Sequence, residues 1–198
     1  MLTQSEIIST LEMLKNEHLD VRTVTLGVNL LDCAGSGLPH VQRRVAERLL
    51  ALAGNLVPVC DRVGQKYGIP VVNKRIAVSP LAVVGAGLAP GELVELARTL
   101  DTVAREVHVD FIGGFSALVQ KGLARGDRAL IEAIPEALTV TDRVCASVNV
   151  ASTRAGINMD AVLRMGRTVK QAAELTAERD GVACTKLCIF ANIPEDIP

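Results

Sequence analysis

Small polar side chains that follow predicted strands are the residues of this chain whose types could do chemistry. Parallel strands of an α/β protein bring their carboxyl ends and the amino ends of the following helices to one edge, so these side chains would share a pocket. Asparagine within an apolar run is costly unless it forms hydrogen bonds, which also favours a polar pocket. The alternative is that these side chains cap loops and helix ends. The candidate ligand-binding residues are Asn29, Arg75, Ser79, Gly113, Gly114, Ser116, Ser147, Asn149, Ser152 and Asn192.

Three further side chains are candidates for catalysis. Asp32 and Asp110 could transfer a proton, and Cys33 could act as a nucleophile. A nucleophilic thiol needs a base or a helix amino terminus nearby. His40 follows Cys33 in the sequence, but no HxxxH or HExxH pattern accompanies them, so we expect no metal site.

Two features favour an anionic ligand. In the run Asn73-Lys74-Arg75, adjacent side chains of a strand point to opposite faces, and an inward Arg75 would suit a carboxylate or phosphate. Alternatively Arg75 pairs with an acidic neighbour such as Asp110 or Glu195. Gly113-Gly114 directly after a strand resembles a turn whose backbone amides approach an anion, although a tight strand–helix turn needs the same glycines.

These side chains must be positioned by alternating strands and helices. Alternating β-branched runs predict strands at residues 21–31, 69–78, 107–112, 144–150 and 184–192. Apolar residues at helical spacing predict helices at residues 3–16, 39–67 with a kink near Pro58, 90–106, 115–123, 127–138 and 158–179. Right-handed crossovers between the five strands then give one α/β domain over residues 1–198, with a parallel sheet covered by helices.

Composition excludes several classes of function. Lys plus Arg (21) nearly balance Asp plus Glu (22) and aromatic residues make up 2% of the chain, so nucleic acid is an unexpected partner. No apolar run is long enough to span a membrane, and the amino terminus lacks the features of a secretory signal. Five cysteines without CxxC spacing suit reduced thiols and a cytoplasmic location.

Three segments carry a resemblance to a known family. VNKRIAVSP (residues 72–80), DFIGGFSALVQKG (110–122) and SVNVASTRAGINMDAV (147–162) resemble the UPF0210 family, also known as DUF711. The resemblance implies a fold similar to the pyruvate formate-lyase-like glycyl radical enzymes, whose ten-stranded α/β barrel consists of two five-stranded parallel halves. The five strands predicted here would be the N-terminal half. No segment resembles a radical glycine loop, so the resemblance implies no glycyl radical and leaves the cofactor unassigned.

A half-barrel has two unpaired sheet edges and an open inner face that we expect to be apolar, so a second copy, chain or segment would complete it. The reaction cannot be named from these residues. Our first hypothesis is an enzyme-like binder of a small polar or anionic metabolite at the carboxyl ends of the strands. The alternatives are a non-catalytic, metabolite-sensing regulatory oligomer and a structural partner subunit.

Overall fold

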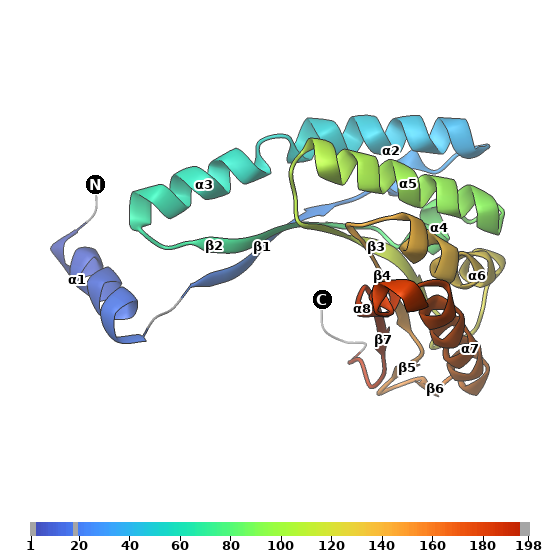
Figure 1. Ribbon diagram of the computed structural model, residues 1–198. Helices are drawn as coiled ribbons and strands as arrows, with labels where there is room; N and C mark the ends of the chain where they lie inside the picture. The colour runs from blue at the N-terminus through green and yellow to red at the C-terminus, as the bar shows by residue number, and fades with distance from the viewer. Residues whose placement is uncertain (1–2, 18–19, 195–198) are drawn as a thin grey trace.

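A single parallel sheet forms the centre of the molecule (Figure 1). The computed structural model describes residues 3–17 and 20–194. Within them the five strands are in the order β1-β2-β3-β4-β7, and each pairs with its neighbours in parallel. The predicted α/β class is thereby confirmed. The sheet is open, with β1 and β7 as its edges. The strands are β1 (Val21–Val28), β2 (Val71–Val78), β3 (Phe111–Leu118), β4 (Val144–Asn149) and β7 (Leu187–Phe190).

Four long helices lie side by side along one face of the sheet (Figure 1). In chain order each contacts the next, and their apolar stripes bury side chains such as Leu49, Leu100 and Ile134 in one continuous core. The last helix is capped at its start, because the Asn158 side chain accepts a hydrogen bond from the Ala161 N–H. These helices are α2 (Leu38–Ala53), α5 (Pro90–Glu106), α6 (Arg125–Val140) and α7 (Met159–Leu175).

Shorter elements connect or extend this framework. α1 and α3 extend it at the amino end of the sheet, and an antiparallel pair, β5 and β6, follows β4. No helix among the described residues is long and apolar enough to span a bilayer. The short elements are α1 (Gln4–Glu12) with a π-helical turn (Met13–Glu17), a 3-10 turn (Leu31–Cys33), α3 (Leu56–Tyr67), α4 (Leu81–Val84), β5 (Ala151–Ser152), β6 (Gly156–Ile157), a second 3-10 turn (Ala177–Arg179) and α8 (Val182–Thr185).

The long helix expected at residues 39–67 is two helices. The break falls at Gly54 and Asn55, between α2 and α3, rather than at Pro58. Pro58 lies in the first turn of α3, where backbone N–H groups have no partner within the helix. The absence of an N–H group in proline therefore breaks no helical hydrogen bond. A predicted kink at this proline is therefore wrong.

β3 also differs from the expectation. It begins at Phe111 rather than residue 107 and runs through Gly113 and Gly114 to Leu118, so no helix occupies residues 115–123. The register with β4 shifts between Gly113 and Phe115, which marks a β-bulge. Gly114 has φ 120°, and a Cβ there would lie 2.3 Å from Val78 Cγ2. The two glycines therefore form a bulge inside a strand, and the predicted anion-binding turn before a helix is wrong.

Among the residues that the structure describes, no helix covers the second face of the sheet (Figure 1). Its side chains are mostly small or polar, and Thr25, Arg75, Ala77 and Cys188 are exposed on it. Toward the amino ends of the strands this face is hollowed into a depression of about 440 Å³. An open face is thus present, and many of the residues on it are small, such as Thr25, Ala77, Gly113 and Cys145.

Candidate functional site

Asn29 and Ser79 lie together where β1 and β2 end. The Ser79 hydroxyl donates to Asn29 Oδ1 at 3.1 Å and accepts from the Leu30 N–H at 3.1 Å. Asn29 Oδ1 also accepts from the Leu31 N–H at 2.9 Å. These contacts close the turn after β1, so both side chains already have partners within the chain.

Asp32 and Cys33 follow in the adjacent 3-10 turn. Asp32 forms an ion pair of 2.6 Å with Arg48 of α2. Cys33 is buried, and its thiol donates to Asp32 Oδ1 across 3.8 Å. Burial, followed by the negative charge of Asp32, raises the pKa of the Cys33 thiol. A raised pKa disfavours the thiolate that a nucleophile needs.

Asp110 lies at the opposite end of the sheet. It immediately precedes β3, where its carboxylate accepts the Lys74 N–H at 2.7 Å and its own N–H donates to the Lys74 carbonyl at 2.8 Å. These bonds fix the start of β3 against β2. Asp32 and Cys33 are at the carboxyl edge and Asp110 at the amino edge, so the three candidate catalytic residues are not brought together.

Arg75 points to the open face. Its guanidinium lies 5.3 Å from the centre of the Phe111 ring, and among the described residues it forms no ion pair. It lines the depression on that face with Cys145 and Lys186. Burial raises the pKa of the Cys145 thiol, and the positive charges of Lys186 and Arg75 only partly oppose this. The pairing of Arg75 with Asp110 that we considered does not occur, and the alternative partner, Glu195, lies outside the described residues.

Ser116 and Ser147 also face this side. They are neighbours across β3 and β4, and the Ser116 hydroxyl donates to the Gly114 carbonyl at 3.3 Å. Asn192, after β7, has a φ of 58°, a left-handed conformation that asparagine tolerates in turns. None of these three residues lines the depression on the open face or the cavity at the ends of β3 and β4.

A second cavity lies where β3 and β4 end. Its volume is about 360 Å³. Asn149 is buried there, and its Oδ1 accepts the Ala151 N–H at 3.3 Å. Gln120 Oε1 is buried and has no hydrogen-bond partner among the described residues. The cavity is lined by Leu118, Gln120, Lys121, Asn149, Arg154, Ile193 and Pro194.

This cavity shares Asn149 with the sequence prediction. Ser152 is buried beside it, and its hydroxyl accepts the Ala155 N–H at 3.0 Å. Gln120, Lys121 and Arg154 were not predicted, because residues 115–123 were expected to be helical and only small polar residues were expected to contribute after β4. The sequence did carry a signal for two of these residues, since Gln120 and Lys121 follow the alternating residues at the end of β3.

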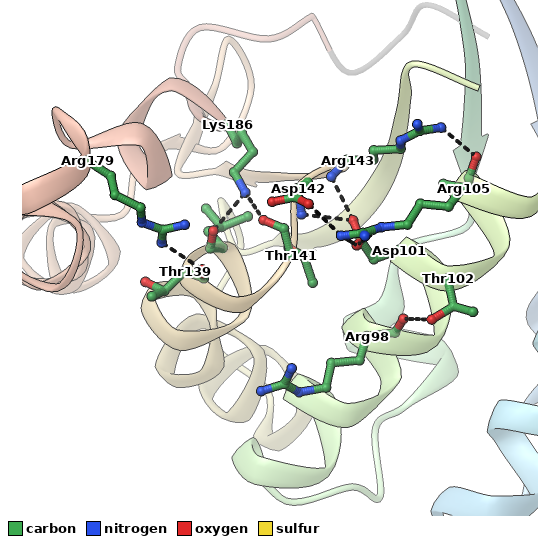
Figure 2. Close-up of polar contacts among 12 residues, drawn as sticks. Arg98, Asp101, Thr102, Arg105, Thr139, Thr141, Asp142, Arg143, Arg179 and Lys186 are labelled. Atoms are coloured by element: carbon green, nitrogen blue, oxygen red, sulfur yellow. Dashed lines mark hydrogen bonds and ion pairs between the residues drawn. The ribbon is translucent and has the colours of Figure 1, made fainter. Parts of the chain in front are cut away.

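A cluster of polar contacts at the amino edge of the sheet is structural (Figure 2). Asp101, buried in α5, accepts the backbone N–H groups of Asp142 at 2.9 Å and Arg143 at 2.7 Å. Arg143 in turn donates to the carbonyls of Ala104 at 3.1 Å and Val109 at 2.7 Å. These bonds join the end of α5 to the start of β4.

Lys186 extends this cluster to the last strand. Its buried ammonium donates to the carbonyls of Leu138, at 2.7 Å, and Thr141 (Figure 2). Burial lowers the pKa of Lys186, while the charges of Asp142 and Asp101 oppose that change. The ammonium thus provides donors for the carbonyls that end α6. Among the described residues no three His, Cys, Asp or Glu side chains are placed to hold a metal ion.

Comparison with known proteins gives close relatives. A UPF0210 protein of Syntrophobacter fumaroxidans is 65% identical over 198 residues, one of Desulfovibrio desulfuricans is 61% identical, and one of Pelotomaculum thermopropionicum is 52% identical. Each match covers all of this chain but 43% or 44% of the relative. The chain therefore spans less than half the length of these relatives.

A family model described as "Uncharacterised ACR (DUF711)" matches residues 12–198. This match covers nearly the whole chain and agrees with the resemblance seen in the three sequence segments. The chain therefore belongs to the DUF711 family, whose members include the UPF0210 proteins.

Proposed function

We propose that this chain binds a small anionic metabolite in the cavity at the carboxyl ends of β3 and β4. The observation that carries the proposal is the convergence of two amide side chains, Gln120 and Asn149, and two cationic ones, Lys121 and Arg154, on one cavity. It lies at the edge where ligands of open parallel sheets bind. A volume of about 360 Å³ suits a small metabolite.

The four polar side chains also indicate the chemical class of the ligand. Lys121 and Arg154 favour a carboxylate or phosphate group. The buried Gln120 Oε1 needs a donor, because an unsatisfied buried acceptor costs about 1–3 kcal/mol. A hydroxyl or ammonium group on the ligand would supply that donor. The favoured ligands are therefore hydroxy acids, amino acids and phosphorylated polyols.

The residues that line this cavity are better suited to binding a ligand without catalysis than to an enzymatic reaction. The described lining contains no carboxylate, histidine or thiol that could act as a base or nucleophile. The candidate nucleophile Cys33 is buried with a raised pKa, and Asp32 is held by Arg48. We therefore favour the metabolite-sensing alternative over the enzyme-like one.

The open sheet supports a larger assembly. One face carries no helix, and the close relatives continue for more than half of their length outside the matched region. We propose that this additional part of the relatives covers the open face and continues the sheet, as in the ten-stranded barrel that the family resemblance implies. The small side chains of that face would permit close packing inside such a barrel.

Isothermal titration calorimetry tests the binding proposal with three probes: malate, serine and glycerol 3-phosphate. At least one probe should bind, and Lys121→Gln combined with Arg154→Gln should weaken its affinity about tenfold or more. Arg75→Gln, which removes a cation from the open face, is the matched control and should leave binding unchanged. Absence of binding by all three probes, or equal loss in the control, would overturn the proposal.

A further inference from the structure

Helix α1 contributes nothing to the core of the fold. Thr3 and Glu6 form a complete capping box at its start, yet none of its residues is buried. Ile7, Ile8 and Leu11 are each about half exposed, at 48%, 50% and 48%. Isolated helices of up to about 12–15 residues are marginal in water, and α1 with the π-helical turn that continues it spans only residues 4–17. A surface outside this helix must therefore stabilise it.

The position of α1 in the chain sets it apart from the rest of the fold. The family model matches from residue 12, where α1 ends, whereas the alignments with the close relatives include all 198 residues. In Figure 1, α1 lies beyond the end of the β1–β2 ribbon and apart from α3. It is thus an accessory helix next to a part of the molecule where the sheet is only two strands wide.

Helix α3 presents a complementary outer face at the same end of the molecule. Its inner side places Cys60 against the framework, while Val59 and Val63, which flank that side, are 41% and 46% exposed. Arg62 and Lys66 are exposed on the same side. The four positions are spaced i, i+3, i+4 and i+7, so they form one stripe that combines two apolar and two basic side chains.

The exposed stripe of α1 has the opposite charge. Ile7, Ile8 and Leu11 lie next to Glu12, and all four are exposed. Within the described residues neither Glu12 nor Arg62 forms an ion pair. Packing one stripe on the other would bury the apolar side chains and bring Glu12 close to Arg62 or Lys66.

We propose that α1 of one copy packs on the outer face of α3 of a second copy, and that the reverse contact forms at the same time. A two-fold symmetric dimer contains this contact twice, so two copies of a small helix–helix interface contribute to its stability. The proposal explains why α1 is capped and amphipathic but not packed in its own chain. It concerns the opposite end of the sheet from the metabolite cavity and does not depend on it.

Light scattering coupled to gel filtration, with sedimentation to measure the dimer Kd, tests this proposal. The wild-type chain should be a dimer at micromolar concentration. Glu12→Lys, or Arg62→Glu with Lys66→Glu, should each raise the dimer Kd about tenfold. Combining all three substitutions should restore much of the loss, since the charges are exchanged. Glu132→Lys makes the same charge change on the exposed surface of α6 and is the control.

A cysteine pair shows whether the contact is between copies. Ile8→Cys with Val63→Cys, in a background without the native thiols, should give a disulfide-linked dimer under mild oxidation. Leu11→Asp should abolish both the dimer and the crosslink. A monomeric wild-type chain, a disulfide within one chain, or charge variants that fail to rescue one another would each overturn the proposal.

Discussion

Asp101 and Arg143 are 42 positions apart in the chain, yet the Asp101 carboxylate accepts the Arg143 backbone N–H at 2.7 Å. The same carboxylate forms an ion pair of 2.9 Å with Arg105 and is itself 7% exposed. One buried charge therefore fixes where β4 begins relative to α5.

Replacement of Asp101 by alanine should be strongly destabilising. The change leaves two backbone N–H groups and Arg105 without their acceptor, and removing one partner of a buried pair costs about 3–5 kcal/mol. Asp101→Asn keeps one acceptor oxygen and should cost less. Urea unfolding measures both, with the exposed Asp142→Asn as the control. An alanine variant within about 1 kcal/mol of wild type would contradict the structural role assigned to this cluster.

Lys186 should give a pH-dependent contribution to stability at alkaline pH. Its pKa is lower in the folded protein than the ordinary value of 10.5 because the ammonium is buried. As the pH rises from the lowered pKa of the folded state to the ordinary value of 10.5, the folded state loses this proton before the unfolded state does. The free energy of unfolding therefore rises with pH over that range. Below the folded pKa, both states hold the proton and the contribution is constant.

The comparison that isolates this effect is wild type against Lys186→Met. The difference in unfolding free energy should grow in favour of wild type as the pH rises from the lowered pKa of the folded state toward 10.5. At neutral pH the variant should still be less stable by about 1–3 kcal/mol, because the Leu138 and Thr141 carbonyls lose a charged donor. A difference that stays constant or shrinks over this range would be evidence against a lowered pKa.

Gly114→Ala should destabilise the chain by about 3 kcal/mol, because its φ of 120° and the contact with Val78 both exclude a side chain. Gly113→Ala is the matched control. A Cβ at Gly113 would have Ile76 O, at 4.0 Å, as its nearest atom, so the change should be within about 1 kcal/mol of neutral. Thermal unfolding distinguishes the two, and equal effects would refute the bulge as the cause.

Gln120→Met should separate ligand binding from stability. The buried Oε1 has no partner to lose, so the unfolding free energy should change by less than about 0.5 kcal/mol or increase. Affinity for the probe that binds wild type should nevertheless fall about tenfold, since the ligand donor loses its acceptor. Denaturation and calorimetry on one preparation test both halves. Unchanged affinity would place the ligand away from Gln120.

Thiol reactivity should follow exposure and pKa. Cys188 is exposed, whereas Cys33 is buried with a raised pKa. A disulfide reagent at neutral pH should modify Cys188 in a fast phase that Cys188→Ser removes and Cys33→Ser leaves intact. If Cys33 reacted faster than Cys188, its role as a candidate nucleophile would return.

Sequence patterns predicted the elements that follow a simple period. α5 and α7 carry an uninterrupted apolar stripe between clear end signals, and both were expected close to their observed bounds. The start of β3 was misplaced because Val107-His108-Val109 alternates like a strand. In the structure Val107 is the C-cap of α5, and His108 has a φ of 59°, a conformation that belongs to neither helix nor strand.

The location of the candidate site was predicted better than the set of residues that form it. Asn149 lines the carboxyl-edge cavity, and Ser152 is buried beside it. Both were predicted because the alternating pattern indicates where a strand ends. Asp110 was expected within a strand at residues 107–112, whereas it precedes β3 at the amino edge of the sheet. The bulge at Gly114 adds a residue to the alternation, so Ile112 and Phe115 both face the helices, and no rule of period two foresees this.

The cluster around Asp101 and Lys186 also has an evolutionary consequence. It anchors the amino edge of the sheet through main-chain atoms, which are present whatever side chains neighbouring positions carry. Loops at the carboxyl edge can therefore accept new residues without weakening that anchor. Within one ancestral scaffold, specificity could diverge among descendants while the fold persisted.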